Sequence, residues 1–288
     1  MFLLAQLIGL FVTYNYSVVG KVLPYGMEPP AIDAAPGLTS IVISFAIAIA
    51  VIFLLMKIKA AFILRTWFFL VVALAVGITL TLLLSFFGIP NTSFIAFIIA
   101  LVLAYFKTFR RGMIIHNLTE LLIYPGIAAV FVPILNLWTL IVLLILISVY
   151  DMYAVWHSGF MQKMANYQIK ELKFFAGFFV PYFGKKERDK IKKLKQIKKV
   201  KGKLTKKEMN KKFKVNLAIL GGGDVVFPII ASGVVMVAWG LLSALMVPIG
   251  ATIALGLLLY YSEKGKFYPA MPFISAGIFL GMIVGWLL

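Results

Sequence analysis

Two aspartates, Asp151 and Asp224, stand inside long apolar stretches of a chain that has only ten acidic residues. An ionised carboxylate within a bilayer is costly unless it is paired, so an acid in such a stretch is a candidate functional residue. Two carboxyl groups at hydrogen-bonding distance cannot both ionise in a low dielectric, and the pair therefore holds one shared proton. The ionised member can take a proton from water while the protonated member donates to a carbonyl oxygen. This is acid–base hydrolysis of an amide.

The composition places these acids in a membrane. The chain has 288 residues and is 62% hydrophobic and 13% charged, whereas soluble domains have roughly 25% charged residues. Many of its apolar runs approach or exceed the ~18 residues that cross the hydrocarbon core, which predicts an all-α, polytopic membrane protein. The first run lacks the basic start and cleavage site of a signal peptide, so we expect it to remain as a span. The absence of cysteine excludes disulfides, thiolate metal sites and a cysteine nucleophile.

Nine transmembrane helices are predicted from these runs. They cover residues 2–19, 38–56, 67–87, 92–106, 115–131, 134–156, 215–239, 240–261 and 268–288. Residues 215–261 would form a helix about 70 Å long, so we expect two crossings with a break near Trp239-Gly240. Pro125-Gly126 is expected to kink the fifth span. The organisation is six spans over 1–162, a basic loop over 163–214 and three spans over 215–288, within one integral membrane domain.

The distribution of Lys and Arg supports this count. All but one of the 28 basic residues fall in loops on one side, 19 of them in the 163–214 loop, and only Lys21 falls on the other side. Because basic residues collect in cytoplasmic loops, the N-terminus and the 163–214 loop are predicted to be cytoplasmic and the C-terminus external. We expect a multi-pass protein of the plasma membrane. The loop itself, a candidate for disorder, is predicted to lie against anionic lipid headgroups, and no nucleic-acid partner is expected.

The depths of the two aspartates agree under this layout. Asp151 lies 12 residues before Lys163 and Asp224 lies 10 residues after Lys214, which places each about 15–18 Å from the basic face if the helices continue. We therefore expect the two acids, which are on consecutive spans, to meet.

A third acid, Glu120, lies near the cytoplasmic start of the fifth span and has a different interpretation. It lies one helical turn from His116 and near Arg110 and Arg111. A structural ion pair at the cytoplasmic end of the bundle is the preferred interpretation.

Glycine and proline flank the candidate site. Three glycines precede Asp224 and Pro228 follows it, a pattern that permits close approach and loosens the helix at the acid. Pro269 and Pro272 precede the last span, and favour an extended stretch whose backbone could hydrogen-bond a peptide.

Together these motifs resemble the YD, GxGD and PAL motifs of the presenilin and signal peptide peptidase family of intramembrane aspartyl proteases. The resemblance covers essentially the whole chain and implies a presenilin-like fold of nine spans. It also implies cleavage of transmembrane helices or signal peptides, without metal or cofactor. Carried over, Asp151 and Asp224 would be the catalytic pair. The residues that would shape the site are Tyr150, Gly221, Gly222, Gly223, Pro269, Ala270 and Met271. Met271 stands where the family has leucine.

Two other functions use some of the same residues. A proton- or cation-coupled transporter could employ Asp151 and Asp224, but it predicts internal repeats that the sequence does not display, and it has no use for the Pro269 segment. A prepilin-type peptidase also carries a GxGD motif, but gives no role to Tyr150-Asp151. The protease is the preferred hypothesis.

Overall fold

The computed structural model describes residues 1–28, 61–110, 112–157, 176–183, 215–262 and 268–288, with five isolated positions between 43 and 54. The chain divides into two compact units. One comprises Met1–Gly177 and Gly221–Leu288 and contains the long helices; the other is Phe178–Leu220 and contains most of two strands.

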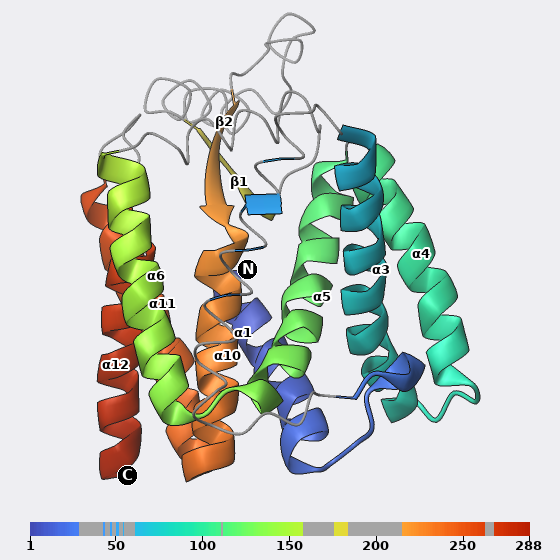
Figure 1. Ribbon diagram of the computed structural model, residues 1–288, viewed down its shortest axis with the longest axis horizontal. Coiled ribbons are helices and arrows are strands. Elements are labelled where there is room, and N and C mark those ends of the chain that lie inside the picture. The colour runs from blue at the N-terminus through green and yellow to red at the C-terminus, as the bar shows by residue number, and fades with distance from the viewer. Residues whose placement is uncertain are drawn as a thin grey trace, which may run out of the picture. The chain divides into compact units, whose positions relative to one another are not determined.

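The helical unit is shown in Figure 1. Its first half contains α1 (Phe2–Thr13), the π-helical turn η1 (Tyr14–Val18), the 3₁₀ turn η2 (Pro24–Gly26), α3 (Ala61–Phe86), α4 (Thr92–Phe109), α5 (Met113–Phe131), η3 (Val132–Ile134) and α6 (Leu137–Trp156). Its second half contains α10 (Gly222–Trp239), α11 (Leu241–Tyr261) and α12 (Met271–Leu287). Strands β1 (Gly177–Phe183) and β2 (Val215–Gly221) pair in a two-stranded sheet.

Six helices in the described ranges are long and apolar enough to cross a membrane. They are Phe62–Phe86, Thr92–Phe109, Met113–Ile134, Leu137–Trp156, Gly222–Trp239 and Leu241–Tyr261; two shorter apolar helices are Phe2–Val18 and Met271–Leu287. The predicted span at 38–56 lies largely outside the described residues, so the number nine stays a prediction. Large apolar side chains such as Val102, Leu146 and Ile253 are exposed on these helices. Exposed apolar surface of this extent suits contact with lipid rather than water.

The predicted breaks between helices are found where the sequence has turn residues. α10 ends at Trp239, and Gly240 has a φ of 94°, a conformation that favours glycine, before α11 begins. η3 contains Pro133, and α6 then begins with a capping box between Asn136 and Thr139. α5 continues as helix through Pro125.

The prediction of helix from residue 215 is wrong. Residues Val215–Gly221 form β2, and α10 begins only at Gly222. Consecutive glycines are poor helix formers, and the partner strand β1 has the aromatic-rich sequence GFFVPYF, which suits a sheet. The chain is therefore mostly helical rather than all-α. Strand β1 also lies within the predicted 163–214 loop; apart from β1 and Ala176, that loop is outside the described residues.

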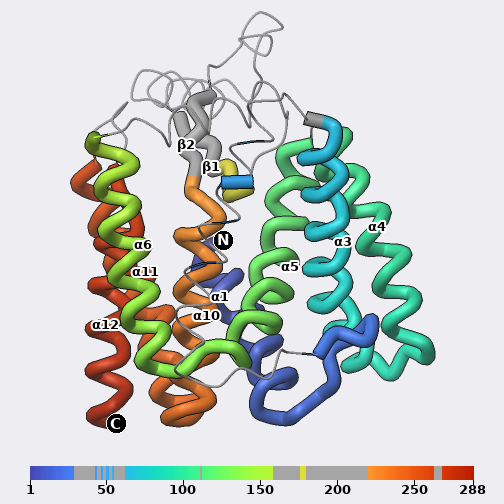
Figure 2. The backbone as a smooth tube through the Cα atoms, in the orientation of Figure 1, coloured from blue at the N-terminus to red at the C-terminus, as the bar shows by residue number. Residues whose placement is uncertain are grey.

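Helix α10 is at the centre of the helical unit. It packs against α1, α5, α6, α11 and α12, and Figures 1 and 2 show it between the α6, α11 and α12 group and the α5, α3 and α4 group. Glycine permits the closest contacts between neighbours. A Cβ atom at Gly126 of α5 would overlap the carbonyl oxygen of Ala75 in α3, and one at Gly250 of α11 would overlap that of Gly277 in α12. The packing of α6 and α10 against their neighbours fixes the positions of Asp151 on α6 and Asp224 on α10.

Candidate active site

Asp151 is held by the beginning of α12. Its side chain projects from the last two turns of α6 and is buried, at 3% exposure. The Met271 amide donates a hydrogen bond of 3.0 Å to Asp151 Oδ2, and the Ala270 amide also interacts with this carboxyl group. These amides are available because the first turn of a helix leaves its N–H groups without intrahelical acceptors. The predicted Pro269–Ala270–Met271 segment thus contacts Asp151 through its backbone.

A second contact fixes α6 against α12. The Ser148 and Ser275 hydroxyls form a hydrogen bond of 2.9 Å, one turn away from the Asp151 contact on each helix. Ser148 also donates to the Leu144 carbonyl oxygen within α6. The Met271–Asp151 and Ser148–Ser275 hydrogen bonds determine the register of α6 against α12 and with it the position of Asp151.

Asp224 lies in the first turn of α10, directly after the glycines. The prediction of its depth assumed a continuous helix from Lys214, and β2 removes that assumption, because a strand rises about 3.3 Å per residue. The Gly221 backbone donates to the Asp224 carboxylate. A Cβ atom at position 221 would lie 3.1 Å from Asp224 Oδ2, so the first glycine of the motif leaves room for the acid.

The two aspartates come from helices in contact. α6, which carries Asp151, packs against α10, which carries Asp224. The expectation that the two acids meet stays a prediction, and the packing of their helices is compatible with it.

The other predicted residues differ in their surroundings. Tyr150 is 45% exposed beside Asp151, whereas Pro269 and Met271 are buried. Gly223 is exposed, and among the residues that the structure describes a Cβ atom there would meet only Phe227, at 3.7 Å. Packing against the described residues therefore does not explain Gly223.

Two residues near Asp224 are missed by reasoning from the sequence. A Cβ atom at Gly222 would lie 3.1 Å from the hydroxyl oxygen of Tyr124, a buried residue of α5. Gln6 of α1 is also buried, and its Nε2 donates to the Val225 carbonyl oxygen at 3.0 Å. A polar glutamine in the first apolar run was the available signal for Gln6. Tyrosine is frequent in this chain, so Tyr124 gave none.

Glu120 has a different main partner from the one predicted. Its carboxylate forms a buried ion pair with Lys107, in the last turn of α4. His116 Nε2 lies 3.5 Å from Glu120 Oε1, as the helical spacing predicts. The Arg110 guanidinium instead lies over the Phe106 ring, 5.5 Å from its centroid, and Arg111 is outside the described residues. Lys107 reaches Glu120 because it is on the face of α4 that packs against α5.

Comparison with known proteins now identifies the family. The model of the family described as signal-peptide peptidase, presenilin aspartyl protease matches residues 2–288. This chain belongs to that family. Two solved structures of a presenilin family intramembrane aspartate protease, from crystals in space groups C222 and P2, have the same fold. Each has a TM-score of 0.61; identities are 21% and 20%, and the matches cover 100% of this chain and 96% and 95% of theirs. No curated protein sequence matches the chain.

Family membership confirms two predictions. The resemblance to presenilins and signal peptide peptidases is correct, and the chain is an aspartic endopeptidase of the intramembrane-cleaving type. The transporter and the prepilin-type peptidase are accordingly set aside. The roles of the individual residues and the expectation of a site without metal or cofactor stay predictions.

Proposed function

We propose that Asp151 and Asp224 form a catalytic dyad that hydrolyses peptide bonds of transmembrane helices or signal peptides within the bilayer. The observation that carries the proposal is the packing of the two helices that hold these acids, in a chain of an aspartyl protease family. The contact of Asp151 with the Met271 amide supports it, because that contact orients the carboxyl group. Gly221 supports it by leaving room for Asp224.

The dyad would work with one proton and one negative charge. The ionised carboxylate takes a proton from water as the water oxygen attacks the scissile carbonyl carbon, and the protonated carboxyl donates to the carbonyl oxygen. The tetrahedral diol then returns a hydroxyl proton to the second carboxylate, the first carboxyl donates its proton to the amide nitrogen, and the C–N bond breaks. Both acids recover their starting states. Because Met271 occupies Oδ2 of Asp151, we assign Oδ1 to the water.

The setting of this chemistry follows from the charges of the chain. We infer nine spans, a cytoplasmic N-terminus and 163–214 loop, and an external C-terminus in the plasma membrane, because basic residues collect on one side. The basic loop would contact anionic headgroups.

The dyad can be tested with purified protein and a synthetic transmembrane peptide in detergent or lipid. Asp151→Asn and Asp224→Asn should each lower the cleavage rate by about 100-fold or more, the usual contribution of a general acid or base. Glu28→Gln, which neutralises an exposed acid of a loop, is the matched control and should cleave at the wild-type rate. Products are measured by mass spectrometry.

The two outcomes are distinct. Loss of cleavage in both asparagine variants, with unchanged thermal unfolding, supports the dyad. Wild-type cleavage by either folded variant rejects it.

A further inference from the structure

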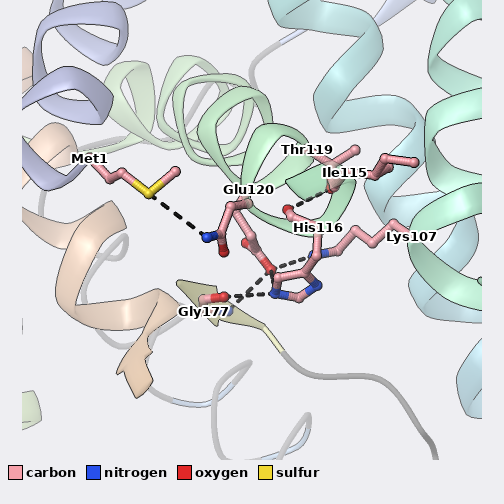
Figure 3. A network of polar contacts seen from close by, with 8 residues as sticks. Met1, Lys107, Ile115, His116, Thr119, Glu120 and Gly177 are labelled. Atoms are coloured by element: carbon pink, nitrogen blue, oxygen red, sulfur yellow. Dashed lines mark hydrogen bonds and ion pairs between the residues drawn. The ribbon is translucent and has the colours of Figure 1, made fainter. Parts of the chain in front are cut away.

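A buried polar cluster around Glu120 has no part in the hydrolysis described above. Glu120 is 1% exposed, and Figure 3 shows Lys107, His116 and Gly177 converging on it. Lys107 supplies the opposite charge. The cluster is on α4 and α5, whereas the two aspartates are on α6 and α10. Burying an ion pair in an apolar bundle costs free energy. The contacts that Glu120 makes besides its pair with Lys107 therefore require a functional explanation.

One set of contacts leads from Glu120 to α10 through the backbone. The Gly177 amide donates to Glu120 Oε1 at 3.1 Å, and His116 Nε2 donates to the Gly177 carbonyl oxygen at 2.8 Å. Both backbone groups of Gly177 are thus held by α5. The preceding residue, Ala176, accepts a hydrogen bond of 3.3 Å from the Gly222 amide. The cluster therefore fixes a segment that holds the first residue of α10.

A second set of contacts reaches the same residue through a side chain. Tyr124 lies one turn beyond Glu120 on α5 and is buried, at 3% exposure. Its hydroxyl would be 3.1 Å from a Cβ atom at Gly222, so it lies directly against this glycine. Gly222 is two residues before Asp224, in the same helical turn.

We propose that Glu120 and Tyr124 are positioning residues for Asp224. Glu120, paired with Lys107, fixes Gly177 and through Ala176 the Gly222 amide, and Tyr124 packs its hydroxyl against the same glycine. The first turn of α10 follows a strand and contains three helix-destabilising glycines, so it needs support from outside the helix. The inference rests on the proposed dyad, because positioning matters only if Asp224 takes part in the reaction.

A role in positioning predicts a specific kinetic pattern. Misplacement of a catalytic group by about 1 Å can cost on the order of 100-fold in rate. Tyr124→Phe, which removes one oxygen and no charge, should lower kcat about tenfold. Glu120→Gln, which removes the ion pair with Lys107 and weakens the hold on Gly177, should lower kcat by about 10- to 100-fold. KM should stay within about twofold of the wild-type value for both variants, because the substrate contacts are intact.

The experiment measures kcat and KM per active site, with sites counted by titration with a hydroxyl-containing transition-state mimic. Tyr260→Phe, at an exposed tyrosine of α11, is the matched control for Tyr124→Phe, and Glu28→Gln is the control for Glu120→Gln. If Glu120→Gln lowers the amount of folded protein, Tyr124→Phe decides the question. Asp224→Asn is measured in the same assay.

A lower kcat per titrated site in Tyr124→Phe, with unchanged KM, supports positioning. A merely structural role predicts fewer titrated sites or a lower unfolding temperature, with kcat per site unchanged. That result overturns the positioning role of Tyr124. If Asp224→Asn is inactive in the same assay, the proposed dyad still stands. Wild-type cleavage by Asp224→Asn rejects the proposed function itself.

Discussion

The two aspartates are held by backbone groups that belong to different motifs. Asp151 accepts from the Met271 amide, at the start of α12, whereas Asp224 accepts from Gly221, its own preceding turn. Asp151 therefore depends on the packing of two helices and Asp224 on the conformation of one short segment. Substitutions near the two acids should differ in their effects for this reason.

Gly221→Ala is expected to lower activity with little loss of stability. The added Cβ atom would lie 3.1 Å from Asp224 Oδ2 and push the carboxylate by a few tenths of an ångström. We expect kcat to fall about tenfold, since catalytic geometry tolerates small displacements poorly. Gly112→Ala is the control: Gly112 is also the extended N-cap of a helix, but within the described part of the chain its Cβ would meet only Ile115, at 3.7 Å. Equal kcat values for the two variants would remove steric exclusion as the reason for Gly221.

Among single residues, the sequence identified those that cost free energy when they lie in an apolar run. Asp151, Asp224 and Glu120 could all be found because a carboxylate within a membrane span requires an explanation. Tyr124 could not, since it is one of 12 tyrosines and an aromatic residue is unremarkable in an apolar helix. Lys107 was assigned to a loop, although the last turn of α4 extends to include it. Predicted span ends are too imprecise to decide such a case.

Among the elements, α11 and α12 are joined by close backbone contacts. Gly250 of α11 and Gly277, Gly281 and Gly285 of α12 leave no space for a side chain, because a Cβ atom on any of them would overlap backbone of the other helix. Small residues at helix interfaces are the usual means of close packing in membranes. Since α12 also carries the Met271 amide, this packing supports the site indirectly.

Gly250→Ala should therefore destabilise the bundle. Its Cβ would overlap the Gly277 carbonyl oxygen, which is backbone and cannot move alone. Overpacking of this kind costs about 1–3 kcal/mol of unfolding free energy. Gly256→Ala, in the same helix, meets nothing within 4 Å among the described residues and should be neutral or stabilise by up to about 1 kcal/mol, since alanine is the better helix former. Unfolding in mixed detergent measures both. Equal unfolding free energies for the Gly250→Ala and Gly256→Ala variants would show that α11 and α12 can move apart at Gly250 with little cost.

The break between α10 and α11 was predicted from the apolar sequence, whereas strand β2 was not. The break at Gly240 was predicted because glycine and an excessive helix length pointed to the same position. Strand β2 was not, because a short apolar run of about seven residues has no period that separates strand from helix. Its partner β1 lies within a loop that was recognised by its charge alone. Pairing between segments so far apart in the sequence leaves no local signal.

Over the whole molecule, the orientation in the membrane depends on charge rather than on packing. The helices do not distinguish one side of a bilayer from the other, whereas the basic residues do. The chain contains no cysteine, so single introduced cysteines can be labelled without background. This permits a direct test with a membrane-impermeant maleimide on intact cells.

Phe87→Cys, between α3 and α4, and Leu288→Cys, at the C-terminus, should react from outside; both positions are highly exposed. Lys195→Cys in the basic loop and Ser262→Cys after α11 should react only after the cells are opened. The physical reason is that the Lys-rich loops remain on the side of the anionic cytoplasmic leaflet. The cysteine-free chain is the control for labelling background. External labelling at position 195 together with protection at position 288 would invert the orientation and place the basic loop outside the cell.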